Sequence, residues 1–172
     1  MIDGLLEAWG LKALSRAGWE RRGLLDVESV AAHSWGIATL VLCLLPDELD
    51  RERALSYALL HDLPEVRIGD ITPHDGVSKA DKAAMESDAM ASLCAALPNG
   101  DRLLALWHNY EAQQDPEARF VRQLDRLDMA IQAAHYHQTT GIDTTEFIDS
   151  AAQVIKDPTL VALLDAIRER LR

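Results

Sequence analysis

The sequence has few basic residues for its number of acidic ones. It contains 17 Lys and Arg residues against 28 Asp and Glu residues, which gives a formal net charge of -11 and an isoelectric point of about 4.9. DNA, RNA and anionic membranes are bound chiefly by cationic side chains. The composition therefore argues against a nucleic-acid polymer or a membrane as the main partner. It remains compatible with a small anionic substrate, because a bound dication can reverse the local charge.

The sequence is also poor in cysteine and has no long apolar run. Cys43 and Cys94 form no CxxC pair and lie in apolar helical stretches, which predicts buried free thiols in a reducing compartment. The longest uncharged stretch, residues 29–46, is too short and too polar to indicate a membrane span. Residues 1–7 lack the basic start and apolar core of a signal peptide. We therefore expect a cytoplasmic protein.

No stretch alternates apolar and polar residues convincingly enough to predict a strand, and there is no internal repeat. Apolar residues instead recur at helical spacing, and five helices have a plausible N-cap in Ser29, Asp50, Ser78, Asp115 and Asp157. The predicted helices cover about residues 5–14, 29–45, 50–62, 78–97, 101–111, 115–139, 146–155 and the chain from 157 onward. Residues 18–23 are predicted to be a loop, and residues 66–77 an irregular segment. The fold class is all-α, with a single domain over residues 1–172.

One predicted helix ends in an adjacent His61 and Asp62, two common ligands of divalent metals. Consecutive helical residues point about 100° apart, so both can reach one ion only if it lies between them at a helix end. Pro64 predicts such an end, because a helix seldom runs past the residue before a proline. The alternative is a buried histidine that caps its own helix while Asp62 faces water.

Two further polar residues lie in apolar helical stretches. His33 lies near the start of an almost wholly apolar helix, and a buried imidazole needs a hydrogen-bond partner or a metal. Asp125 lies in a core-facing pattern, where it is either a ligand or the ion-pair partner of Arg122 or Arg126. Two histidines and two aspartates would form a set of nitrogen and oxygen ligands that suits Mn, Fe, Co, Ni or Zn.

The order His33, His61-Asp62, Asp125 resembles the H…HD…D signature of the HD-domain metal-dependent phosphohydrolases. The surrounding residues are similar to the 5′-deoxynucleotidase branch of that family. The similar segments are residues 28–34, 61–65, 69–73, 75–79, 110–111 and 116–120. The resemblance extends over roughly residues 11–136, which is most of the chain.

The resemblance implies an all-helical HD domain, usually a homodimer, whose metal site lies within about residues 28–130. It implies that His33, His61, Asp62 and Asp125 hold one divalent transition metal. It also implies an enzyme that removes the 5′-phosphate from nucleoside monophosphates and prefers the deoxy forms. A small nucleotide is thus the expected substrate, and the metal would activate water and neutralise phosphate charge.

The resemblance also suggests which residues act on the substrate. Glu65 is expected to position or deprotonate the attacking water, and Asp70 to share a catalytic and a binding role. The segment Ile71, Thr72 and Pro73 is expected to lie along the substrate, with Asp70 near the sugar. The simpler alternatives are a solvated Glu65 and an Asp70 that only forms a turn.

The loop before His33 supplies candidates for phosphate and sugar binding. In the family, an arginine shortly before a tryptophan orients the phosphate while the tryptophan borders the sugar, which suggests Arg16 and Trp19 here. Arg21 and Arg22 are close alternatives for the phosphate, since a guanidinium suits it best. A surface arginine and a core aromatic are the simpler interpretations of the same residues.

Two other functions fit the same residues. The first is an HD phosphohydrolase that acts on another small phosphate ester, such as a flavin or signalling nucleotide. The second is a metal or nucleotide sensor without catalytic activity. The complete ligand set together with Glu65 and Asp70 favours an enzyme, while the preferred base, the native metal and the physiological role stay open.

Overall fold

A computed structural model describes residues 1–171, so residue 172, the last of the predicted domain, lies outside it. The described residues form ten α-helices and two short 3₁₀ helices, with no strand beyond an isolated bridge between Ser15 and Ser29. The all-α prediction is confirmed. In order, the elements are α1 (Ile2–Trp9), η1 (Gly10–Lys12), α2 (Ala17–Glu20), α3 (Val30–Leu44), α4 (Arg51–Leu60), α5 (Glu65–Ile68), η2 (Pro73–Asp75), α6 (Lys79–Cys94), α7 (Gly100–Ala112), α8 (Pro116–Thr140), α9 (Thr145–Val154) and α10 (Pro158–Glu169).

The five predicted N-caps are confirmed, and they fix where α3, α4, α6, α8 and α10 begin. Each cap side chain accepts a hydrogen bond from a backbone N–H two or three residues later. This satisfies donors that the first helical turn leaves without a partner. In α8 and α10 a proline follows the cap, where its missing N–H costs no hydrogen bond.

Four details of the prediction are wrong. The first helix begins at Ile2 and ends at Trp9, after which η1 continues the turn. The predicted loop of residues 18–23 contains most of α2, a single turn too short to show a periodic pattern. The irregular segment 66–77 contains most of α5 and all of η2. Cys94 is buried as predicted, but Cys43 is exposed. The prediction for Cys43 failed because α3 is apolar on nearly every side, so its sequence pattern does not show which face is buried.

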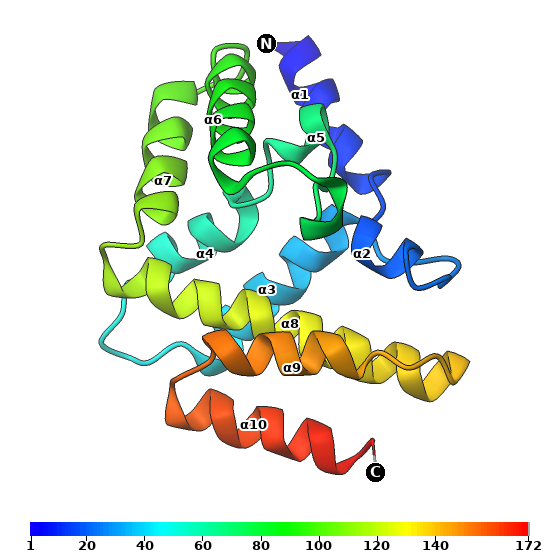
Figure 1. The fold of residues 1–172 in the computed structure, drawn as a ribbon. Helices are drawn as coiled ribbons and strands as arrows, with labels where there is room; N and C mark the ends of the chain where they lie inside the picture. The colour runs from blue at the N-terminus through cyan, green and yellow to red at the C-terminus, as the bar shows by residue number, and fades with distance from the viewer. Residues whose placement is uncertain (172) are drawn as a thin grey trace.

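The long helix α8 packs against α3, α4, α9 and α10 around the larger of two apolar clusters (Figure 1). The smaller cluster lies among η1, α3, α6 and α7 and includes Leu93 and Trp107. Helix α3 contributes Val30 to the smaller cluster and Ile37 to the larger one. His33, which is buried between these two positions, therefore lies where the clusters meet. No helix among residues 1–171 is long and apolar enough to cross a membrane.

Candidate metal centre

His33 lies in the first turn of α3 and is almost completely buried. Its Nδ1 lies 2.7 Å from Oδ2 of Asp128 on α8. A carboxylate accepts the proton of Nδ1, so the contact orients the ring and leaves the Nε2 lone pair free to bind a metal. The structure thus adds Asp128, which sequence reasoning missed. The available signal was its position one turn after Asp125, on the same side of the helix.

His61 follows the last residue of α4 and is held in the same way by its own backbone. Its Nδ1 donates to the carbonyl oxygen of Ala58 at 3.0 Å, which leaves Nε2 as the free nitrogen. The Nε2 atoms of His33 and His61 are both buried, and neither has a hydrogen-bond partner among residues 1–171. A buried polar atom without a partner is costly, and two such nitrogens that converge are placed to bind one metal ion.

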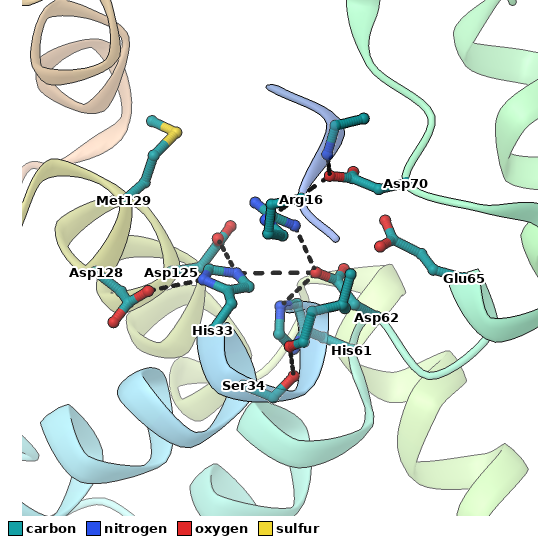
Figure 2. Close-up of polar contacts among 12 residues, drawn as sticks. Arg16, His33, Ser34, His61, Asp62, Glu65, Asp70, Asp125, Asp128 and Met129 are labelled. Atoms are coloured by element: carbon teal, nitrogen blue, oxygen red, sulfur yellow. Dashed lines mark hydrogen bonds and ion pairs between the residues drawn. The ribbon is translucent and has the colours of Figure 1, made fainter. Parts of the chain in front are cut away.

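The carboxylates of Asp62 and Asp125 complete the cluster (Figure 2). Asp62 Oδ2 lies 3.1 Å from His61 Nε2 and 3.8 Å from His33 Nε2, and Asp125 Oδ1 lies 3.2 Å from His33 Nε2. The ligand atoms of His33, His61 and Asp62 all lie within 4.8 Å of one another. Two imidazoles and two carboxylates fit a divalent transition metal, so these residues suit the ion that the H…HD…D pattern implies.

The charges in the cluster shift its pKa values in opposite directions. Burial and Arg16 would lower the pKa of His33, but the carboxylates of Asp125 and Asp128 outweigh them and raise it to about 9. Burial would raise the pKa of Asp62, yet His61 and Arg16 hold it well below its usual range. The Asp125 carboxyl also has a lowered pKa despite burial, because His33 lies beside it. The two carboxylates are therefore ionised and ready to bind a cation at neutral pH.

Arg16 is the candidate phosphate ligand that the structure brings to this cluster. Its Nη1 lies 3.2 Å from Asp62 Oδ2, and its Nε lies 3.8 Å from Asp70 Oδ2 (Figure 2). The backbone fixes this position, because Arg16 N donates to the Glu28 carbonyl at 3.1 Å, just before α3. The alternatives lie elsewhere, since Arg21 and Arg22 are exposed and pair with Asp75 and Glu146.

Glu65 begins α5 and points toward the cluster, three residues after Asp62 (Figure 2). Its side chain is 2% exposed, and Oε2 has no hydrogen-bond partner among residues 1–171. Burial, together with the carboxylates of Asp62 and Asp70, raises the pKa of Glu65 to about 10. The structure thus places a buried carboxyl group with one free oxygen beside the candidate metal ligands, which the solvated alternative does not predict.

Asp70 lies between α5 and η2 and is held by the first residue of α2. Its Oδ2 accepts a hydrogen bond from the backbone N–H of Ala17 at 2.9 Å, so Asp70 joins this segment to the start of α2, directly after Arg16.

Asp125 has two charged neighbours, because its Oδ1 faces His33 and its Oδ2 lies 3.6 Å from Arg126 Nε. Both interpretations of Asp125 are therefore compatible with the geometry, one oxygen facing His33 and the other facing the arginine.

The other expected substrate residues make contacts of their own. Trp19 is 2% exposed and packs against Tyr136 and Phe147, and its Nε1 donates to Glu28 Oε1 at 2.9 Å. Thr72 caps η2, because its Oγ1 accepts a hydrogen bond from the His74 N–H, and Pro73 is the exposed first residue of that turn. The Ile71 carbonyl accepts a hydrogen bond from Lys82. Trp19 is thus part of the core, next to the loop that carries Arg16.

Similarity to known proteins extends over most of the chain. A model of the HD domain matches residues 9–161. Over 163 residues the chain is 37% identical to 5′-deoxynucleotidase HDDC2 of Danio rerio, which covers 92% of this chain and 82% of that protein. The crystal structure of PH0347 protein from Pyrococcus horikoshii OT3 is similar with a TM-score of 0.83, at 30% identity and 99% coverage of both chains. A predicted metal-dependent phosphohydrolase from Magnetospirillum magnetotacticum MS-1 gives a TM-score of 0.73 at 27% identity, covering 99% of this chain and 90% of the other.

Proposed function

The chain belongs to the HD-domain family, and on that premise we propose that it is a metal-dependent 5′-deoxynucleotidase. It would hydrolyse the 5′-phosphate ester of deoxynucleoside monophosphates. The observation that carries the proposal is the convergence of two unpartnered imidazole nitrogens, from His33 and His61, on the ionised carboxylate of Asp62. The ionised carboxylate of Asp125 lies beside His33. The names of the curated relatives support the substrate class.

We propose His33, His61, Asp62 and Asp125 as the ligands of one divalent transition metal ion, drawn from Mn, Co, Fe, Ni and Zn. When bound, such an ion lowers the pKa of a coordinated water and neutralises part of the phosphate charge. The protein's own contribution is to hold both imidazoles with Nε2 free, through the Asp128 carboxylate and the Ala58 carbonyl.

In this proposal Arg16 binds and orients the phosphate. Its guanidinium lies between Asp62 and Asp70, and its backbone N–H is held by the Glu28 carbonyl. A guanidinium suits phosphate because its N–H groups match the spacing of two phosphate oxygens. A substrate phosphate placed here would lie between Arg16 and the metal ligands.

Glu65 is proposed to move the proton. In the metal-free protein Glu65 is protonated at neutral pH, but a divalent ion bound beside it would lower its pKa. Its free Oε2 would then accept a proton from the water that attacks phosphorus, as the bond between phosphorus and the 5′-oxygen breaks. A proton must then reach the leaving 5′-oxygen. We assign this transfer to Glu65, which returns the proton it has accepted, and Asp70 is the second carboxyl group that shares this catalytic role. The products are a nucleoside and inorganic phosphate.

The sugar side is assigned to Asp70 and the turn from Ile71 to Pro73, with the buried Trp19 behind them, next to the residue that binds the phosphate. Asp70 accepts a hydrogen bond from the backbone N–H of Ala17, and the backbone N–H of Trp19 donates to the Arg16 carbonyl at 3.2 Å. One short segment therefore links the proposed phosphate and sugar positions. Rejecting an added hydroxyl by shape alone gives only ~10²-fold discrimination. We therefore expect deoxy substrates to be preferred by a modest factor, with several bases accepted.

We further propose a homodimer and a cytoplasmic location, with residues 1–172 as a single HD domain. Helix α3 supports the dimer, because Trp35 and Leu42 lie two turns apart on one face and are 69% and 61% exposed. The free thiols Cys43 and Cys94 fit a reducing compartment.

Light scattering of the wild type and of Trp35→Glu tests the dimer. Trp9→Glu, on the exposed face of α1, is the matched control and should stay dimeric.

The function is tested by measuring phosphate release from a panel of nucleoside 5′-monophosphates. Metal-stripped protein is supplied in turn with Mn, Co, Fe, Ni, Zn or no metal, and each deoxy substrate is paired with its ribo form. Flavin mononucleotide and a cyclic dinucleotide represent the other phosphohydrolase function. Cleavage of the cyclic dinucleotide releases no inorganic phosphate, so it is followed by chromatography of the linear product. Release that requires metal and favours the deoxy forms supports the proposal. Metal binding without any release would support the sensor and contradict the proposal.

A further inference from the structure

Lys82 lies in the first turn of α6, beside the candidate site but outside the residues assigned to it above. Its Nζ donates to the carbonyl oxygen of Ile71 at 3.0 Å. The same atom lies 3.9 Å from Glu65 Oε1 and 3.4 Å from Glu86 Oε1. One ammonium group thus contacts the proposed proton carrier and the proposed substrate-binding turn.

Local structure fixes both ends of this connection. The Lys82 backbone N–H donates to the Ser78 carbonyl at 2.9 Å, and the Ser78 side chain caps the same turn of α6. Directly after Ile71, the Thr72 N–H donates to Asp75 Oδ2 at 2.7 Å, in the capping box that begins η2. The ammonium therefore joins two segments that are already held by their own hydrogen bonds.

The surroundings of Glu65 explain why a cation is needed there. Its buried carboxyl group faces the carboxylates of Asp62 and Asp70, so an ionised Glu65 is repelled from two sides. Arg16 and Lys82 are the nearby positive charges that oppose this repulsion. Burial alone would lower the pKa of Lys82, but Glu86 and Glu65 raise it, so the amine stays charged at neutral pH.

We propose that Lys82 is a positioning residue for hydrolysis, whose ammonium orients the Glu65 carboxylate and ties it to the Ile71 carbonyl. The inference rests on the proposed function, since it acts through Glu65. A Lys82–Glu86 pair at spacing i, i+4 would by itself be an ordinary surface contact of little energetic value. The two additional contacts, to a buried carboxyl group and to a backbone carbonyl, indicate a role beyond that pair.

Three substitutions separate the charge from the hydrogen bond. Lys82→Met removes both, Lys82→Gln keeps a donor for Ile71 without the charge, and Lys82→Arg keeps the charge. We expect Lys82→Met to lower kcat about 10- to 100-fold and to raise KM, the scale of losing a charge-assisted contact. Lys82→Gln should lower kcat to the same extent with little change in KM. Lys82→Arg should retain most of the wild-type kcat.

Two further measurements exclude a purely structural role. Ethylammonium added to Lys82→Ala should partly restore kcat, whereas ethanol should not, because only the former supplies a positive charge. Lys79→Met, at the exposed first residue of α6, is the matched control and should have wild-type kcat and KM. Metal content, measured by elemental analysis, should be the same in every variant.

The outcomes distinguish this inference from the function on which it rests. An active wild type with unchanged kcat in Lys82→Met and Lys82→Gln would overturn the role of Lys82 alone. So would a loss that neither Lys82→Arg nor ethylammonium reverses, because Lys82 would then serve packing only. A wild type that releases no phosphate with any metal would overturn the proposed function together with the inference.

Discussion

Gly36 of α3 makes room for Asp128 of α8, because a Cβ at position 36 would lie 2.1 Å from Asp128 Oδ1. Glycine in the middle of a helix is ordinarily less favourable than alanine by about 1 kcal/mol. At this position the missing side chain lets the Asp128 carboxylate approach α3 and reach His33 Nδ1 at 2.7 Å. A cost in helix stability thus allows a contact that orients His33, one of the proposed metal ligands.

We predict that Gly36→Ala weakens metal binding although it improves helix propensity. The added methyl group displaces Asp128, and the loss of such a supporting contact typically lowers metal affinity 10- to 100-fold. Titration calorimetry with Zn²⁺ measures the affinity. Gly18→Ala is the control, because its Cβ would make an ordinary 3.6 Å contact with Phe147. Unchanged affinity together with higher stability would show that Asp128 is free to move and that the contact is unimportant.

Glu65→Gln and Asp125→Asn should separate proton transfer from metal binding. Glu65→Gln keeps the size of the buried side chain and leaves the ligand set intact, so the protein should retain its metal. It should lose about 10²- to 10⁴-fold in kcat, the usual contribution of a positioned acid or base. Asp125→Asn removes a charged ligand and should lose both metal and activity while circular dichroism shows the helices unchanged.

Measured metal content decides how each variant is interpreted. A Glu65→Gln protein with full metal and full activity would assign proton transfer to Asp70 or to solvent. An Asp125→Asn protein that keeps one equivalent of metal and wild-type turnover would remove Asp125 from the ligand set. In that case its pairing with Arg126, 3.6 Å away, would be its main role.

The sequence predicted most of the fold because its signals are local. Ser29, Asp50, Ser78, Asp115 and Asp157 each cap the helix they were expected to begin, since a capping side chain bonds to backbone only two or three residues away. The exposed face of a helix cannot be predicted in this way when most of its residues are apolar. The spacing of apolar residues in α3 does not distinguish its faces, so the exposure of Cys43 follows only from how α3 packs against α4 and α8.

The site was predictable where its residues are neighbours in sequence or carry a recognisable pattern. His61, Asp62 and Glu65 lie within five residues, and the H…HD…D order predicted that His33 and Asp125 belong to the same site. The structure places both beside that cluster. Other participants depend on packing between distant segments. Lys82 reaches Glu65 only because α6 packs against α5, and nothing in its own sequence surroundings indicates that contact.

Arg16→Ala should reduce kcat/KM for deoxy and ribo substrates by the same factor, about 10- to 100-fold, because the phosphate is common to both. The ratio of the two rates should therefore stay as in the wild type. Arg22→Ala is the control, since Arg22 is exposed and pairs with Glu146 away from the cluster. A change in the deoxy-to-ribo ratio for Arg16→Ala would instead place Arg16 next to the sugar.

The pKa shifts at the candidate site predict how the metal-free protein responds to pH. The pKa of His33 is raised from 6.5 to about 9, so the folded chain keeps a proton there that the unfolded chain releases. This contribution to stability is fully present below pH 6.5 and is lost as the pH rises through 9. Glu65 acts in the same direction, because its pKa is raised from 4.5 to about 10. The lowered pKa values of Asp62 and Asp125 affect stability only in acid.

The free energy of unfolding of the metal-free protein should therefore fall steadily between pH 6.5 and pH 9. Urea titrations in the presence of a chelator measure this slope, and His33→Gln should reduce it because one of the two groups is removed. With Zn²⁺ the dependence should weaken or reverse, since a metal-bound His33 is neutral and metal affinity rises as competing protons leave. A metal-free protein whose stability is constant or increases over this range would contradict the charge distribution described for the cluster.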